Sequence, residues 1–154
     1  MSIVIFPPFT EHSENVEQVC SMYHFDYRKK NWEEAEQDCK RRNYDGLVSM
    51  QTEGEWVNLK NITANREQKI GLEKTRWFIG LQYLSHKWCW SNDTSACINQ
   101  TTNKTGYWRW SGGEPNNLDT EHCVEMYNGG EYNNINCLSR FGHTGFICEK
   151  KVGM

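Results

Sequence analysis

The chain has 154 residues and a net charge of −3, which fits a single domain and excludes a strongly basic nucleic-acid-binding surface. Seven Trp and seven Tyr accompany few aliphatic residues, so the core must rely on aromatic side chains and covalent cross-links. None of the seven cysteines lies in a CxxC pair, which argues against a zinc ribbon or a thioredoxin motif.

The N-terminal part predicts an extended segment followed by a strand and a helix. Residues 1–18 are expected to be an extended lead-in, and residues 19–151 to form the domain. Aromatic residues alternate within Val19–Tyr27, which favours a strand. Asn31 has Glu34 at the capping-box position, so a helix is expected to begin there and to be ended by Asn43–Gly46.

A short strand is expected next, at Leu47–Met50, followed by a second helix. Thr52 and Glu55 repeat the capping-box spacing, and apolar residues then recur at helical intervals until about Asn65, where this helix is expected to end. The apolar segment Trp77–Leu81 predicts another strand.

No helical periodicity follows between Gln82 and Asn117, so this stretch is expected to be a long and functional loop region. Further strands are predicted at His122–Met126 and Thr144–Glu149, with a Gly-rich turn at Asn128–Glu131. Two helices followed by several short strands indicate an α+β fold.

Cysteines and glycosylation sequons together predict a protein of the secretory pathway. Four Asn-x-Thr sequons occur, at Asn61, Asn92, Asn99 and Asn103, and three of them are crowded into what is expected to be a surface loop. Buried free thiols in a cytosolic protein are the alternative, but the sequons oppose it. We therefore expect an extracellular or cell-surface ectodomain, although no signal peptide or membrane-spanning segment is evident in the sequence.

A cluster of oxygen-bearing side chains predicts a calcium site. Its members are Glu114, Asn116, Glu121, Asn133 and Asn134. Calcium prefers six to eight oxygen ligands from carboxylates, amides, backbone carbonyls and water. No His or Cys lies among these five residues, which argues against zinc or copper.

These segments resemble the C-type lectin-like domain family over most of residues 20–150. The matching segments are Asn31-Trp32-Glu33-Glu34-Ala35, Trp77-Phe78-Ile79-Gly80-Leu81, Trp88-Cys89-Trp90-Ser91-Asn92, Trp110-Ser111-Gly112-Gly113-Glu114-Pro115-Asn116-Asn117, Glu121-His122-Cys123-Val124, Asn133-Asn134-Ile135-Asn136-Cys137 and Gly145-Phe146-Ile147-Cys148-Glu149. The resemblance implies the C-type lectin-like fold, with two helices flanking small antiparallel sheets and a long irregular calcium-binding loop region.

The resemblance also implies a disulfide framework. It pairs Cys39 with Cys148 and Cys123 with Cys137, while Cys89 and Cys97 could form a third pair across a hairpin. Cys20 is left over, and is expected to be free or to bridge to another chain.

In the sugar-binding members that this chain resembles, the proline of this motif, which is Pro115 here, follows a cis peptide bond. Calcium in those members holds two vicinal sugar hydroxyls. Glu114 with Asn116 would contact one hydroxyl, and Glu121 with Asn133 the other. Asn134 would give the ion its side-chain oxygen and its backbone carbonyl. The Glu-Pro-Asn motif goes with equatorial hydroxyls, and therefore with glycans of the mannose, N-acetylglucosamine, glucose and fucose class.

The chain departs from the family pattern at Asn134, where an Asp is usual. Only two carboxylates then face the ion, so we expect one weak calcium site, with a dissociation constant of about 10⁻⁴–10⁻³ M. An accessory calcium site is expected to be absent, because Asn117 and His122 stand where acidic residues would be needed.

Two other functions compete with sugar binding. A degenerate sugar site could leave a domain that binds a protein ligand, and a glycoprotein ligand is a related alternative. Glu114 and Glu121 could also form a glycosidase pair, but no catalytic constellation is evident, so an enzyme is not expected.

The expected partners are mannose-type glycans, with no nucleic acid and no direct membrane contact. Weak single-site binding would require an oligomer or a larger receptor for avidity. The sequon-rich segment Asn92–Thr105 is expected to be a solvated insertion; alternatively it borders the site and restricts which glycans enter.

Overall fold

The computed structural model describes residues 2–5, 19–70, 75–99 and 109–153. Within these ranges two helices accompany one nine-stranded mixed sheet, which confirms the predicted α+β class. In chain order the elements are β1 (Ser2–Ile5), β2 (Val19–Asp26), α1 (Trp32–Arg41), β3 (Gly46–Leu47), α2 (Glu53–Ile70), β4 (Arg76–Leu84), β5 (Lys87–Trp90), β6 (Asp93–Asn99), β7 (Cys123–Tyr127), β8 (Tyr132–Ile135) and β9 (Thr144–Gly153).

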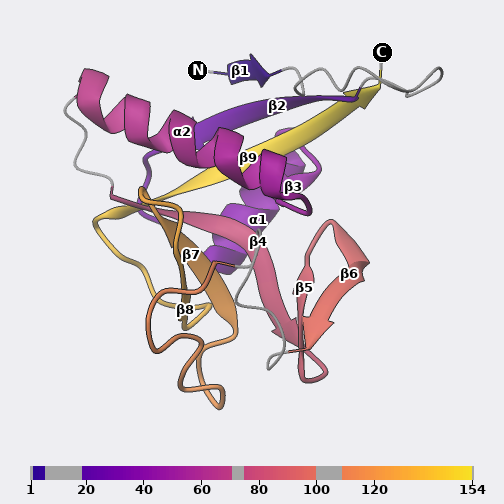
Figure 1. Ribbon diagram of the computed structural model, residues 1–154, viewed down its shortest axis with the longest axis vertical. Coiled ribbons are helices and arrows are strands. Elements are labelled where there is room, and N and C mark those ends of the chain that lie inside the picture. The colour runs from indigo at the N-terminus through magenta and orange to yellow at the C-terminus, as the bar shows by residue number, and fades with distance from the viewer. Residues whose placement is uncertain (1, 6–18, 71–74, 100–108, 154) are drawn as a thin grey trace.

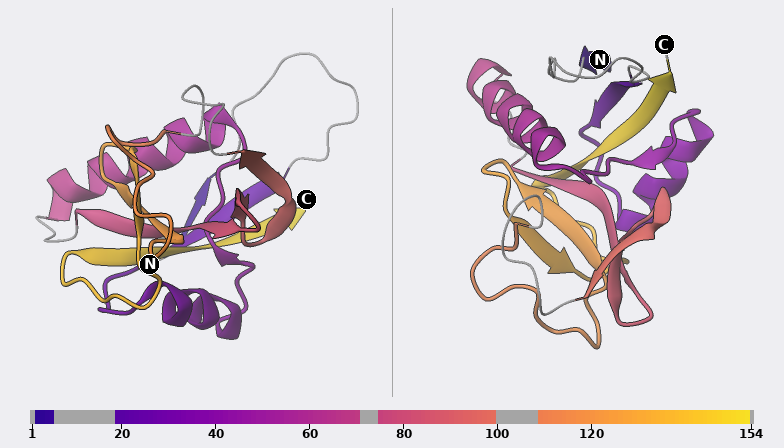
Figure 2. Two further views of the ribbon diagram at one scale, coloured as in Figure 1. Left: turned by 90° about the horizontal axis from the view of Figure 1, so that it is seen from below. Right: turned by 45° about the vertical axis from the view of Figure 1, so that its right-hand side comes forward.

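The sheet is built around β4, which pairs with three other strands. Its path runs β1-β2-β9-β4-β5-β6, with β3 beside β9 and the β7–β8 pair branching from β4. Among the pairings of these described strands, only that of β4 with β9 is parallel. The two helices lie on opposite sides of the long strands β2, β9 and β4, as the left view of Figure 2 shows.

Alternation along β4 divides the interior into two cores. Trp77 and Ile79 pack with the core that includes Trp56 of α2, whereas Phe78 packs with the core that includes Trp32 of α1. Among the described residues with less than 2% exposure, the six largest side chains are all aromatic, namely Trp77, Trp88, Trp90, Tyr132, Phe78 and Phe146. The predicted reliance on aromatic residues is therefore confirmed.

Local hydrogen bonds explain where both helices begin. Asn31 accepts a hydrogen bond from the Glu34 amide, and the Glu34 carboxylate accepts one from the Asn31 amide, so the predicted capping box is present. Thr52 likewise caps α2 by accepting a hydrogen bond from the Glu55 amide.

The predicted end of α2 near Asn65 is wrong, because the helix continues to Ile70. Residues 66–69 are strong helix formers. Arg66 also anchors this last part, since it donates to the Tyr27 hydroxyl and lies 4.2 Å from the centre of the Phe25 ring.

The stretch expected to be an irregular loop contains the β5–β6 hairpin, and the Cys89–Cys97 disulfide crosses it as predicted. The other implied disulfides, Cys39–Cys148 and Cys123–Cys137, are also present. The seventh cysteine, Cys20, is free and only 4% exposed. A disulfide from Cys20 to another chain would therefore require Cys20 to become exposed first.

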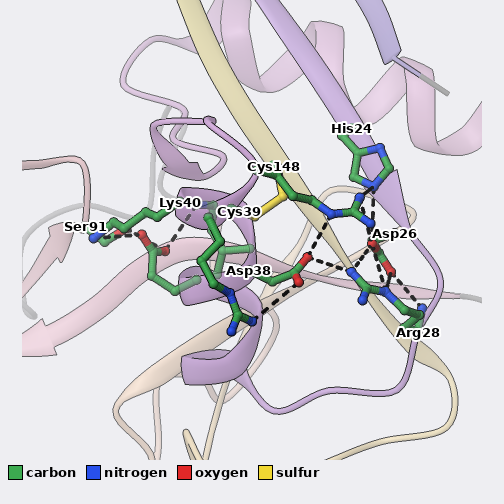
Figure 3. The surroundings of a disulfide bond; sticks show 12 residues. His24, Asp26, Arg28, Asp38, Cys39, Lys40, Ser91 and Cys148 are labelled. Carbon is green, nitrogen blue, oxygen red and sulfur yellow. Dashed lines mark hydrogen bonds and ion pairs between the residues drawn. A yellow bond between two sulfur atoms is a disulfide. The ribbon is translucent and has the colours of Figure 1, made fainter.

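A partly buried ion-pair network joins β2 to α1 beside the Cys39–Cys148 disulfide (Figure 3). Arg28 donates to both carboxylate oxygens of Asp26, at 2.9 and 2.8 Å, and to Asp38 at 2.6 Å. Asp26 is 5% exposed. Burial raises the pKa of Asp26, but the hydrogen bonds from Arg28 outweigh this effect and lower it to about 2.

Replacing Asp26 by Asn is expected to lower the free energy of unfolding by about 2 kcal/mol at neutral pH, because charge-assisted hydrogen bonds to Arg28 are lost. The folded-state pKa is depressed, so this stabilisation is present above the unfolded value near 3.8 and is lost as the pH falls toward 2. Urea denaturation should therefore show a difference between wild type and variant that shrinks across this window. Asp119→Asn, at an exposed position, is the control. A difference independent of pH would contradict the assignment.

Candidate functional site

Three of the five predicted site residues, Glu114, Asn116 and Glu121, lie on the irregular segment between Trp110 and β7, and the other two lie on β8. The segment is anchored to β8 at its start, where the Ser111 amide donates to the Tyr132 carbonyl at 2.9 Å. Ser111 then closes a turn by accepting from the Glu114 amide at 3.0 Å. The Glu114–Pro115 bond that follows is cis, as the resemblance implied. We refer to residues 114–121 as the site loop.

Asn134 fastens the site loop to the sheet. Its Oδ1 accepts from the Asn116 amide at 3.1 Å, and its Nδ2 donates to the carbonyl oxygens of Asn116 and Glu121, the latter at 3.0 Å. The residue is 1% exposed. Four predicted site residues are thereby brought together, since Glu114 and Glu121 lie at the two ends of the loop that Asn134 holds.

The two carboxylates of the site lie close enough to influence one another. Asn116 Nδ2 donates to Glu114 Oε1 at 3.1 Å, and Asn117 Nδ2 donates to Glu121 Oε1 at 3.4 Å. Burial, followed by the negative charge of Glu121, raises the pKa of Glu114. Glu114 Oε2 is buried, and no hydrogen-bond donor from the described residues reaches it.

This arrangement fits a bound cation. A buried carboxylate oxygen without a donor, next to a second carboxylate, is a position where positive charge stabilises the fold. Within the described ranges no three His, Cys, Asp or Glu side chains gather closely enough to hold a metal by themselves. An ion at this position would therefore also need amide and carbonyl oxygens, which calcium accepts.

The structure gives Asn133 a hydrogen-bond partner on β7 instead of on the site loop. Its Nδ2 donates at 3.1 Å to Oε1 of Glu125, its cross-strand neighbour on β7. Glu125 is fully buried and also accepts from Arg76 and Thr144, at 2.9 and 3.0 Å. Adjacent residues of a strand point to opposite faces, which explains why Asn133 and its neighbour Asn134 have different partners.

Two residues around the site, Asn117 and Glu125, are not among the five predicted from the sequence. The sequence indicates Asn117 only for an accessory site, yet its side chain donates to both Glu121 and Asn116. Its φ of 48° is a conformation that Asn adopts more readily than most residues, so an Asn directly after Glu-Pro-Asn is the sequence signal for this position. Nothing local marks Glu125, because its role depends on the pairing of β7 with β8.

The sequons differ in how accessible their asparagines are. Asn61 is exposed on α2, whereas Asn92 Nδ2, the atom that a glycan would occupy, donates to the buried Ser49 hydroxyl at 3.1 Å. Asn92 Oδ1 is also buried. Asn103 lies outside the described residues, as does the side chain of Asn99.

We therefore expect protein from a secretory host to carry a glycan at Asn61 and none at Asn92, because a glycan there would displace the hydrogen bond to Ser49. Peptide mapping after enzymatic deglycosylation would report each position as a deamidated asparagine. Asn61→Gln should lower the intact mass by one glycan, and Asn92→Gln should leave the glycan number unchanged. Deamidation at Asn92 would contradict this expectation.

Comparison with known proteins places the fold in a family. The family model described as "Lectin C-type domain" matches residues 28–150. Rat L-selectin is 31% identical over 127 residues, which cover 79% of this chain and 30% of that protein. The chain thus spans less than a third of this relative. No helix that the structure describes is long and apolar enough to cross a bilayer.

Solved structures have the same fold. The carbohydrate-recognition domain of mouse scavenger receptor C-type lectin has a TM-score of 0.65 and 22% identity, and the match covers 95% of this chain and 93% of that one. The cow CD23 carbohydrate-recognition domain, solved in the presence of a GlcNAc2Man3 oligosaccharide, has a TM-score of 0.62 and 25% identity over 86% of this chain and 88% of that one. The chain therefore belongs to the C-type lectin domain family, a family of carbohydrate-recognition domains and not of enzymes.

Proposed function

We propose that this domain binds one calcium ion weakly at the site loop and uses it to bind mannose-type glycans. The observation that carries the proposal is the buried Glu114 Oε2, which has no donor among the described residues and lies beside the charge of Glu121. Glu114, Asn116 and Glu121 would hold the ion, with Asn133 and Asn134 as the remaining candidate ligands. Bound calcium would supply open coordination positions that two vicinal hydroxyl oxygens can fill.

The side chains of the site loop suit the recognition of a diol. Carboxylates only accept hydrogen bonds, whereas amides also donate. Glu114 can therefore accept a hydroxyl proton while Asn116, already paired with it at 3.1 Å, can donate to the same hydroxyl oxygen. The Glu-Pro-Asn order supports equatorial hydroxyls of the mannose class, and the oligosaccharide in the cow CD23 structure contains mannose and N-acetylglucosamine.

Retention on a mannose resin tests this function. The domain should bind in millimolar calcium, elute with EDTA and elute with methyl mannoside but not with galactose. Calcium titration without sugar should give a dissociation constant of about 10⁻⁴–10⁻³ M, because only two carboxylates are available. Retention that EDTA does not affect would overturn the calcium requirement.

A second function, binding of a protein ligand without calcium, is favoured by one observation. The amide nitrogens of Asn133 and Asn134 are engaged with Glu125 and with loop carbonyls, so both side chains have protein partners already. Failure to bind the mannose resin at any calcium concentration would support this alternative.

We also propose that the domain works outside the cell as part of a larger receptor or an oligomer. The matched selectin is more than three times longer than the matched segment, and the three disulfides suit an oxidising compartment. A single weak site gains useful avidity only when several sites act together.

A further inference from the structure

At the candidate cation site, the Asn134 side chain directs its amide nitrogen at two backbone carbonyl oxygens of the site loop. One amide group satisfies three backbone groups of the site loop: the Asn116 N–H, the Asn116 carbonyl and the Glu121 carbonyl. Asn134 is only 1% exposed, so these hydrogen bonds form away from water, where an unpaired polar group is costly.

Only an amide can make this set of contacts. The Asn116 N–H requires an acceptor, and the two carbonyls require donors. Asn has one acceptor oxygen and a nitrogen with two donors, whereas an ionised Asp has acceptors only. An Asp at position 134 would place negative charge against two carbonyl oxygens, and a cation between them would be needed to relieve the repulsion.

We infer that the Asn134 amide is a built-in tether that holds the site loop in its binding shape without a bound ion. The tether sets the loop before ligand arrives, and a single change, Asn134→Asp, converts the loop into one whose order requires a cation. The inference rests on the proposed function only for the identity of that cation, since the hydrogen bonds are made within the chain.

Hydrogen exchange of two backbone amides tests the tether. The Asn116 amide donates to Asn134 itself, and the Glu121 amide, which donates to the Asn117 carbonyl at 2.9 Å, reports the order of the loop that the tether holds. In the wild type, the protection of each amide in EDTA should lie within about twofold of its protection in millimolar calcium. Asn134→Ala should lose protection about tenfold or more in both conditions, because three hydrogen bonds are removed. Asn134→Asp should lose protection in EDTA and regain it in calcium.

Two controls separate the tether from general effects. Asn136→Asp introduces the same charge two residues further on, at an exposed position, and should leave the loop amides unchanged. The Gly80 amide, which donates to Val48 at 2.8 Å in the core, reports whether each variant is folded. If a variant does not fold, the comparison of the wild type in EDTA with the wild type in calcium is a sufficient test.

Rapid exchange of the wild-type loop in EDTA would overturn the inference, as would full protection of the loop in Asn134→Ala. Asn134→Asp that is unprotected in EDTA and not rescued by calcium would support the tether and count against the proposed calcium site. The tether and the proposed function can therefore fail separately.

Discussion

Replacing Glu114 by Gln is expected to abolish calcium-dependent retention on a mannose resin and to weaken calcium binding about 10- to 150-fold. The variant keeps the shape of the side chain but removes one of the two carboxylates of the site. Contacts to a charged group contribute about 1.5–3 kcal/mol, which corresponds to that loss of affinity. Isothermal titration with calcium, followed by resin binding, would measure both effects.

The matched control is Glu131→Gln, which makes the same change in net charge. Glu131 is exposed in the turn between β7 and β8. In EDTA the Glu114→Gln variant should unfold at no lower a temperature than the wild type. The reason is that burial and the charge of Glu121 disfavour the ionised form of Glu114, as its raised pKa indicates. Wild-type affinity in the variant would remove Glu114 from the ion site.

Removing the Cys39–Cys148 disulfide, by changing both residues to Ala, is expected to have the largest effect on stability. The bond closes a loop of 109 residues. A loop of this length restricts the unfolded chain by about 5 kcal/mol in chain-entropy estimates. Since whole domains are stable by about 5–15 kcal/mol, the variant should be near the limit of folding. Tryptophan fluorescence during urea denaturation would measure the loss.

The other two disulfides serve as graded controls. Their sequence separations are 14 for Cys123–Cys137 and 8 for Cys89–Cys97. The same estimate gives about 3 and 2.5 kcal/mol. The expected order of destabilisation is therefore set by loop length, and the complete burial of Cys39 and Cys148 acts in the same direction, because their removal leaves a cavity. Equal losses for all three pairs would contradict this account.

The tether also bears on how the proposed weak calcium site would remain useful. If Asn134 already shapes the site loop, little of the binding free energy of calcium is spent on ordering the chain. The loss of one carboxylate relative to the usual family pattern would then be partly offset. A comparison of loop exchange and calcium affinity across the Asn134 variants would test this balance.

Several features could be predicted from the sequence because their physical causes are local or follow a family pattern. The capping box at Asn31 and Glu34 depends on residues three apart, and it is present. The resemblance supplied the disulfide pairs and the cis bond at Pro115, which no composition or periodicity argument would have identified. The predicted alternation of buried aromatic residues in β2 also needs only the period of a strand.

Tertiary structure alone decided the features that depend on distant neighbours. Asn133 and Asn134 are adjacent and chemically identical, yet the register of β8 against β7 directs one to Glu125 and the other to the site loop. Asn92 matches a glycosylation sequon, but the packing of Ser49 engages its nitrogen. The sequence by itself determined which carboxylates and amides this protein has at the candidate site. The packing of the strands determined which of those groups are engaged within the chain, because a hydrogen bond depends on where both partners lie in space.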